Sequence, residues 1–348
     1  MKNIRVLQLT STLRIGGAQL ALLSLVKETK CTNVIVYSEC DDMCEDLKRL
    51  GVKVIKLQFE EDDFPDKLCE IIKSERIDIV HWHGGGGQYN RFCYRFVPKI
   101  KDLGVKFVET PHCARPNDFP DDMIDAIVCS SNYTYSIQQK KSKSVVIPFG
   151  FDYSEYDRVY KDHLKFKNSK LQIGRLGRVE PIKIPHDTIK VANIVYECGV
   201  FQDVEFIVAG FVSGGLNYAF ELARLSRPNT KLLFKTYTGE EKLKLINSFD
   251  IFLYPTSCES FGLSFVEAMF MGKPIITYDH WANKDTVGPG NIIVPFQDIR
   301  ALFAATIDLI TNKEKRERIG LENLQISRER FSGKIFGQRM LNLYESLR

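Results

Sequence analysis

Short β-branched runs alternate with amphipathic helical stretches along the whole 348-residue chain. Several of the runs, such as Asn33–Tyr37, are apolar almost throughout, which is typical of strands covered on both faces. A strand, a helix and the next parallel strand together form a right-handed crossover. The pattern therefore predicts doubly wound parallel sheets of the α/β class.

The chain is too long for one ordinary core, and the alternation weakens after Gly150. Residues 151–169 are polar and aromatic without clean periodicity, so we predict a linker there. We expect an N-terminal Rossmann-like domain over residues 1–150, a second over 170–330, and a final helix over 331–348. Ligands of such sheets bind beyond the carboxyl ends of the strands, where the functional residues are expected.

The expected elements follow from these periodicities. Strands are expected at residues 4–9, 33–37, 52–57, 77–81, 105–110, 126–129, 145–148, 171–176, 204–209, 231–235, 251–254, 274–277 and 292–294. Helices are expected at residues 18–28, 66–73, 89–103, 133–140, 184–197, 218–225, 240–248 and 264–271, and three helical stretches are expected to close the chain, the last at about 332–347.

Charge and hydropathy exclude several classes of protein. The 48 basic residues nearly balance the 44 acidic ones, so no nucleic-acid partner is expected. No apolar run approaches the roughly 20 residues that span a bilayer, and the first residues do not resemble a signal peptide. We expect a cytoplasmic protein. Residues 89–103 interleave bases with aromatics, which suits either peripheral membrane contact or a buried amphipathic helix with a basic outer face.

The densest motif surrounds two glutamates, Glu259 and Glu267, which have seven residues between them. Gly262 stands just before a helical run, where free amide groups and the positive end of the helix dipole favour an anion. A carboxylate can accept hydrogen bonds from two adjacent hydroxyls of a sugar. An anion site between two such carboxylates matches a sugar nucleotide, whereas helix capping and surface carboxylates would give the same spacing.

Two cations, Arg178 and Lys183, follow the strand expected at 171–176. They could hold a diphosphate and stabilise the charge that develops on a departing phosphate. The chain has no Asp-x-Asp pair, the usual carboxylate device for a metal at a nucleotide sugar. The alternative is an ordinary pair of solvated side chains.

A third motif is the glycine loop at Gly16 and Gly17, which follows the first strand and opens a helix. It does not fit the dinucleotide fingerprint, so a phosphate or an acceptor is the better match. His81 and His83 share one face of a strand, but no third ligand is spaced for a metal, and we predict no metal site. The glycine run 84–87 suits either an acceptor-contacting loop or a permissive turn.

In this order, the motifs resemble the family-4 retaining glycosyltransferases of the GT-B fold. The resemblance covers most of the chain and rests on Gly16-Gly17, Asp78–His83, Glu109–His112, Val146–Gly150, Gly177-Arg178 with Lys183, Glu259 to Glu267, and Met271–Ile275. It implies two Rossmann-like domains, a donor-binding cleft between them, and a last helix that crosses back to the N-terminal domain.

The resemblance also implies roles for individual residues. Arg178 and Lys183 would hold the diphosphate, and Glu259 would contact the donor sugar. Glu267 would bind the ribose, and His112 would touch the sugar near the transfer site. Backbone amides for the sugar and phosphate would come from Phe261, Gly262, Leu263 and Ser264, while Gly16 and Gly17 would let the N-terminal loop approach the donor.

Some residues depart from the family pattern. Ser260 stands where the family usually has glycine, and Phe149 stands where asparagine is frequent. Phe234–Tyr237 lacks a usual glycine, and His280–Asp285 replaces a glycine-rich turn with a glutamate. These differences bear on the base and the donor sugar rather than on the type of reaction.

The sequence therefore predicts a retaining glycosyltransferase that needs no cofactor or metal. It would move a hexose-type sugar from a nucleoside-diphosphate sugar, with UDP- or GDP-sugars favoured, to a glycan, a lipid-linked acceptor or a small molecule. A sugar-nucleotide epimerase of the same architecture and a non-catalytic sugar-nucleotide-binding protein are the alternatives. The oligomeric state is left open.

Overall fold

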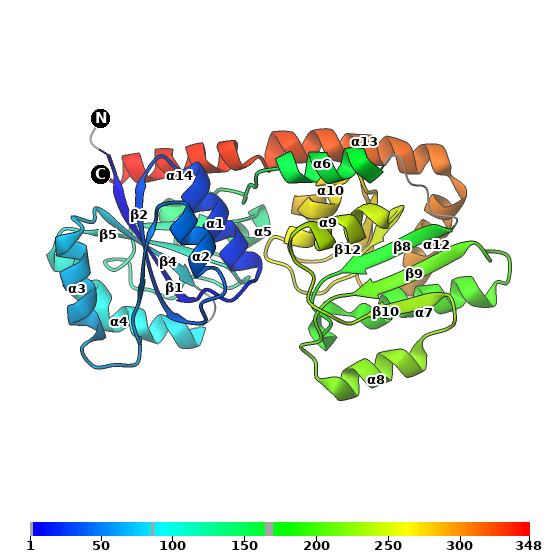
Figure 1. Ribbon diagram of the computed structural model, residues 1–348, viewed down its shortest axis with the longest axis horizontal. Coiled ribbons are helices and arrows are strands. Elements are labelled where there is room, and N and C mark those ends of the chain that lie inside the picture. Colours follow the sequence, from blue (N-terminus) through cyan, green and yellow to red (C-terminus); the bar gives the residue numbers. More distant parts are fainter. Residues whose placement is uncertain (1–2, 85–86, 164–169) are drawn as a thin grey trace. The chain divides into compact units, whose positions relative to one another are not determined.

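The computed structural model describes residues 3–84, 87–163 and 170–348. The chain divides into two compact units, each built on its own parallel sheet (Figure 1). The N-terminal unit contains the residues up to Asp152 together with Phe331–Arg348, and the C-terminal unit contains Tyr153–Arg330. The second unit is therefore a continuous segment inserted into the first.

The sheet of the N-terminal unit has seven parallel strands within the described residues, in the order β3-β2-β1-β4-β5-β6-β7. The strands are β1 (Arg5–Thr12), β2 (Thr32–Glu39), β3 (Lys53–Lys56), β4 (Ile79–Gly84), β5 (Lys106–Pro111), β6 (Ala126–Cys129) and β7 (Ser144–Val146). β2 and β4 are buried nearly throughout, which explains why the middle of β2 is apolar on both faces.

Helices cover both faces of this sheet. They are α1 (Gly17–Glu28), α2 (Cys44–Arg49), α3 (Phe64–Ser74), α4 (Gly87–Asp102), α5 (Asn132–Ser136) and the C-terminal α14 (Gly333–Ser346), with a short 3-10 turn over Lys141–Lys143. One core cluster joins α1 and α2 to β2, and a larger one joins α3 and α4 to the opposite face. Gly85 and Gly86 of the predicted glycine loop lie outside the described residues.

Residues 89–103, except the last, lie in helix α4, which has the buried apolar face expected of an amphipathic helix with a basic outer face. Phe92, Phe96 and Ile100 are buried in the core cluster of α3 and α4. The basic side chains lie on the outer side, where Arg95 donates to the carbonyls of Phe59 and Glu61 and Lys99 pairs with Asp66. No helix in the described ranges is long and apolar enough to cross a membrane.

The C-terminal helix α14 packs against α1 (Figure 1). Phe151 and Ser332 form an isolated parallel bridge, in which the Phe151 amide donates to Phe331 and the Gly333 amide donates back to Phe151. The two segments that connect the units are thus hydrogen-bonded to each other on the N-terminal side.

The C-terminal unit has six parallel strands among the described residues, in the order β10-β9-β8-β11-β12-β13. They are β8 (Leu171–Leu176), β9 (Val204–Ala209), β10 (Thr230–Leu233), β11 (Ile251–Leu253), β12 (Ile275–Asp279) and β13 (Ile292–Pro295). The helices are α6 (Ser154–His163), α7 (Pro185–Glu197), α8 (Leu216–Leu225), α9 (Gly239–Ser248), α10 (Leu263–Phe270), α11 (Asn283–Val287), α12 (Ile299–Thr311) and α13 (Lys313–Arg330), with a 3-10 turn η2 at Pro181–Lys183.

The predicted linker over 151–169 is wrong for most of its length. Residues Ser154–His163 form helix α6, which packs against α9 in the C-terminal unit (Figure 1). Tyr156 and Val159 are buried, so a few aromatic and β-branched residues supply the apolar face. Residues 164–169 of the predicted linker lie outside the described residues. Helices α2 and α11 were also not expected, because each has little more than one turn to show periodicity.

In each sheet the strand order reverses at one place. The reversal lies between β1 and β4 in the N-terminal unit and between β8 and β11 in the C-terminal unit. At such a switch point the loops that follow the two strands run to opposite faces of the sheet and leave a crevice at its carboxyl edge. The loops after β1, β8 and β11 are those in which the sequence placed its candidate residues.

Helix α14 approaches α1 so closely at Gly337 that a Cβ atom there would lie 2.4 Å from the Glu28 carbonyl oxygen. We expect Gly337→Leu to destabilise the N-terminal unit by about 1–3 kcal/mol, because the two backbones must separate. Urea unfolding would be followed by the fluorescence of Trp82, which is buried in this unit. The control is Gln338→Leu, at the exposed neighbouring position. Equal midpoints for the two variants would contradict the packing.

Candidate functional site

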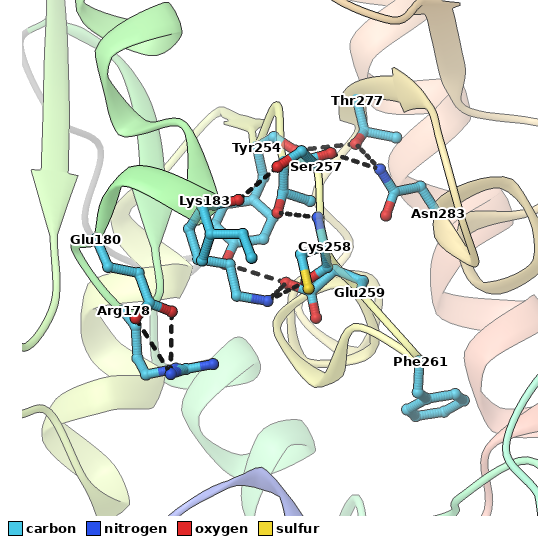
Figure 2. Close-up of polar contacts among 12 residues, drawn as sticks. Arg178, Glu180, Lys183, Tyr254, Ser257, Cys258, Glu259, Phe261, Thr277 and Asn283 are labelled. Atoms are coloured by element: carbon cyan, nitrogen blue, oxygen red, sulfur yellow. Dashed lines mark hydrogen bonds and ion pairs between the residues drawn. The ribbon is translucent and has the colours of Figure 1, made fainter. Parts of the chain in front are cut away.

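The turn after β8 carries the two predicted cations, and the structure gives them different surroundings (Figure 2). The Lys183 side chain is 8% exposed, and its Nζ donates to Glu259 Oε1 at 2.8 Å and to the Cys258 carbonyl. The Arg178 side chain is 62% exposed and pairs with Glu180 at 3.0 Å. The structure therefore brings Lys183 to the glutamate motif and leaves Arg178 at the surface of the same turn.

The charge on Lys183 is secured by its partner. Burial by itself lowers the pKa of a lysine, but the Glu259 carboxylate together with Tyr254 and Cys258 outweighs it, and the net pKa of Lys183 is raised. Tyr254, at the end of β11, adds a second contact because its hydroxyl donates to the same Glu259 oxygen at 3.4 Å. The result is a buried ammonium and a carboxylate that meet at the carboxyl edge of the sheet, between the turns that follow β8 and β11.

The loop over residues 255–262 leads from β11 into helix α10. Gly262 precedes the helix with a left-handed φ of 83°, and a Cβ atom there would lie 2.4 Å from the Phe265 ring. Phe261 is buried, and its carbonyl accepts from Thr286 of α11. Leu263 and Ser264 follow Gly262 as the first residues of α10, so their amides belong to the end of the helix that favours an anion.

The segment over residues 280–285, where the sequence departs from the family pattern, supports this loop. Asn283 is fully buried and donates to the carbonyls of Thr256 and Tyr278, both at 3.1 Å. The Ala282 amide donates to the Glu259 carbonyl at 3.3 Å. Figure 2 shows Asn283 and Thr277 beside the loop that carries Glu259. Sequence reasoning missed this support, because a buried asparagine has no signature in the spacing of the motif.

Glu267, one turn inside α10, has its own cation. Its carboxylate is buried, forms an ion pair with Lys242 of α9, and accepts from the Tyr156 hydroxyl of α6 at 3.4 Å. Burial and the Glu267 charge raise the pKa of Tyr156. Neither partner has a signature in the sequence, since Lys242 lies on an ordinary charged helix and Tyr156 falls in the stretch predicted as a linker. Each of the two glutamates is thus held by a separate lysine.

The remaining three candidate residues lie in the N-terminal unit. Gly16 is the extended residue before α1, with φ −169° and ψ 174°, and Gly17 is the first residue of that helix. Gly17 is exposed at the turn that follows β1. His112 directly follows β5, and its amide donates to the Gly84 carbonyl at 2.9 Å. All three therefore lie at the carboxyl edge of their sheet.

His112 belongs to a chain of buried hydrogen bonds. Its Nε2 lies 3.1 Å from His83 Nδ1, and His83 Nε2 lies 2.8 Å from Gln8 Oε1. An amide oxygen only accepts, so His83 carries its proton on Nε2 and accepts at Nδ1. His112 must then donate from Nε2 to His83 Nδ1.

His81 lies beside this chain on β4. Its ring nitrogens each lie 2.7 Å from a hydroxyl, one of Thr110 and one of Tyr344 on α14. The two strand histidines, His81 and His83, therefore have protein partners on the face that they share, as expected from their alternate spacing. Within the described residues, no group of three or more histidine, cysteine, aspartate or glutamate side chains is arranged to hold a metal ion.

The comparisons with known proteins agree on the fold. Residues 157–324, just under half of the chain, match the family described as glycosyl transferases group 1. A glycosyltransferase from Rickettsia africae ESF-5 superposes with a TM-score of 0.83 at 16% identity, covering 100% of this chain and 99% of its own. Anabaena Alr3699/HepE, solved with UDP and glucose, gives 0.78 at 16% identity, covering 99% of this chain and 100% of its own. The predicted pair of doubly wound sheets of the GT-B class is confirmed.

Two curated relatives are glycosyltransferases by name. The capsular polysaccharide biosynthesis glycosyltransferase CapM of Staphylococcus aureus is 25% identical over 60% of this chain and 56% of its own length. The alpha-1,3/1,6-mannosyltransferase ALG2 of Dictyostelium discoideum is 23% identical over 66% of this chain and 63% of its own. The matched regions thus span less than two thirds of these relatives. The spore coat protein SA of Bacillus subtilis is 24% identical over 96% of both chains.

The buried histidines make the stability of the N-terminal unit depend on pH. Burial lowers the pKa of His81 to about 3 and that of His112 to about 4, and it also lowers the pKa of His83. Between pH 6.5 and pH 4 the unfolded chain therefore binds protons that the folded unit does not. We expect stability to be complete above pH 6.5 and to fall by about 1.4 kcal/mol per pH unit for each histidine as the pH decreases.

The measurement is urea unfolding at pH 7, 6 and 5 in a Trp281→Phe background. The chain has 2 tryptophans, so Trp82 in the N-terminal unit then reports alone. Replacing His81 by glutamine removes one of the three titrating groups. The slope of the unfolding free energy against pH should then decrease by the contribution of about one proton. A midpoint that stays constant from pH 7 to pH 5 would contradict neutral, buried rings.

The ion pair with Lys242 offsets the cost of burying the Glu267 carboxylate. Lys242→Met leaves that carboxylate without its cation, so we expect the C-terminal unit to lose about 3 kcal/mol of stability. The control is Lys244→Met on the same helix, whose side chain is 68% exposed and pairs with Glu240, and which should cost less than about 1 kcal/mol. Denaturant unfolding compares the two variants. Equal losses would show that the Lys242–Glu267 pair carries no special weight.

Proposed function

We propose that this protein is a retaining glycosyltransferase that moves a hexose-type sugar from a nucleoside-diphosphate sugar to an acceptor hydroxyl. The observation that carries the proposal is the meeting of Lys183, Glu259 and the start of α10 at the switch point between β8 and β11. A cation and free helix amides suit a diphosphate, and a carboxylate beside them suits the hydroxyls of a sugar. The names of the relatives and the UDP and glucose bound to the Anabaena protein support the same class of donor.

Each group has a task in this proposal. Lys183 and Arg178 hold the diphosphate and stabilise the negative charge that grows on it as the glycosidic bond breaks. Glu259 orients the sugar hydroxyls, and the amides from Gly262 to Ser264 bind the phosphate. Glu267, held by Lys242, accepts from the ribose hydroxyls. His112 touches the donor sugar near the transfer site.

The transfer would take place on one face of the sugar. The departing phosphate oxygen takes the proton of the acceptor hydroxyl while the new bond forms on the side that the phosphate leaves, so the anomeric configuration is kept. Lys183 serves first as a partner of Glu259 and then as a partner of the phosphate, because an ammonium has three donors and two of them are already used. No metal is required for this step, since cations of the chain carry the charge.

The test begins with thermal-shift screening against UDP-, GDP-, ADP- and TDP-sugars, because a bound donor raises the melting temperature by mass action. The stabilising donor is then incubated with the protein and with candidate acceptors, and water itself serves as the acceptor of last resort. We expect release of the nucleoside diphosphate, with the sugar transferred in its original anomeric configuration as seen by NMR. A rearranged sugar nucleotide would indicate an epimerase, and binding without turnover would indicate a non-catalytic protein.

Glu259→Ala is the matching variant. We expect it to abolish sugar transfer while nucleotide binding remains, because the carboxylate is assigned to the sugar. Product formation and the thermal shift are measured on the same preparation, and Glu317→Ala on the surface of α13 is the control. Activity should also survive a strong chelator. Full activity of the Glu259 variant, or a chelator loss that Mg²⁺ restores, would contradict the assigned roles.

A further inference from the structure

A third cation lies beneath the Lys183 turn. Arg175 is the fifth residue of β8, and its side chain is fully buried. Its Nη1 donates to the Lys183 carbonyl at 3.2 Å, and the guanidinium lies 4.7 Å from the centre of the Tyr254 ring. Within the part of the chain that the structure describes, its Nε and Nη2 have no hydrogen-bond partner and no carboxylate forms an ion pair with it.

This arrangement is costly for a residue that only fills space. A buried charge loses its hydration, and each unpaired donor adds to the loss. A methionine would fill much of the same volume without either penalty. A guanidinium keeps its proton even where burial disfavours the charge, so Arg175 holds a positive charge in surroundings that screen it weakly.

The contacts of Arg175 lead to both partners of the Lys183–Glu259 pair. On one side it holds the backbone of Lys183, just before Ile184, a β-branched residue in the left-handed region at φ 44°. Such a conformation persists only where its surroundings enforce it. On the other side it stacks on Tyr254, whose hydroxyl donates to Glu259. One buried side chain thus contacts the turn that aims the lysine and the ring that steadies the glutamate.

We propose that Arg175 is a positioning residue for diphosphate binding, which sets the direction of the Lys183 ammonium and adds positive charge beneath the turn without touching the ligand. This inference rests on the proposed function. Arg175 must therefore raise the affinity for a nucleoside diphosphate more than the affinity for the matching monophosphate, because the second phosphate brings the additional charge. A side chain that served packing alone would weaken both ligands equally.

The experiment compares Arg175→Met, Arg175→Lys and the unsubstituted full chain. The probes are whichever of UDP, GDP, ADP or TDP stabilises the unsubstituted chain, and the monophosphate of the same nucleoside, with dissociation constants measured by calorimetry. We expect Arg175→Met to lower the affinity for the diphosphate at least tenfold and the affinity for the monophosphate less than threefold. Arg175→Lys, which keeps the charge, should recover part of the loss. The control, Arg227→Met, removes an arginine that is 51% exposed and pairs with Glu197, and should change neither ligand.

A second pair of variants keeps the test valid if Arg175→Met unfolds. Tyr254→Phe keeps the stacked ring and removes the hydroxyl, so it should slow cleavage of the donor sugar and leave the diphosphate affinity within twofold. In a Lys183→Met background, Arg175→Lys should no longer change the affinity for the diphosphate. The substitution keeps the charge at position 175 and removes only the contact that positions Lys183. Two results would overturn the positioning role while leaving the proposed function intact. One is that Arg175→Lys lowers the affinities for the diphosphate and the monophosphate equally. The other is that it lowers the diphosphate affinity as much in the Lys183→Met background as in the unsubstituted chain. Absence of nucleotide binding by the unsubstituted chain would overturn both.

Discussion

The reversal of strand order in a parallel sheet is the constraint on which the rest of this structure depends. Because β8 and β11 are neighbours and their following connections cover opposite faces, the two turns at their carboxyl ends separate and leave room for a ligand. The turn after β8 supplies Lys183, and the turn after β11 supplies Glu259. Charged side chains therefore come together at the carboxyl edge of the sheet, between the two turns.

Charge in this part of the molecule is organised in pairs with distinct purposes. The Lys242–Glu267 pair is buried between α9 and α10 and fixes a carboxylate inside a helix. The Lys183–Glu259 pair lies in a turn and a loop, which can adjust to a ligand more readily than a helix can. Arg175 stands apart from both, since its charge is matched by a ring and a carbonyl rather than by a carboxylate. The local balance is therefore positive beneath the turn, which suits an anionic ligand.

Much of the fold could be predicted from the sequence, because a strand covered on both faces is largely apolar, as in the middle of β2. The motifs follow the strands β8 and β11. The candidates Arg178 and Lys183 lie in the turn after β8, and Glu259 and Glu267 lie in the loop and the helix after β11. The sequence did not predict helix α6 or the side chains that pair with Glu267. Helix α6 shows few apolar positions, because it buries Tyr156 and Val159 against a single neighbour. The lysine and tyrosine around Glu267 come from elements far apart in sequence, and pairing of this kind leaves no trace in spacing.

The route of the chain has a consequence for the order in which its contacts form. The C-terminal unit is one continuous stretch, so all of its internal contacts join residues of a single segment. The N-terminal unit is complete only when α14 joins the sheet, and the hydrogen bond between His81 and the Tyr344 hydroxyl of that helix joins residues that are 263 positions apart. A contact between segments so far apart in the sequence closes a long loop, so we expect it to form late in folding.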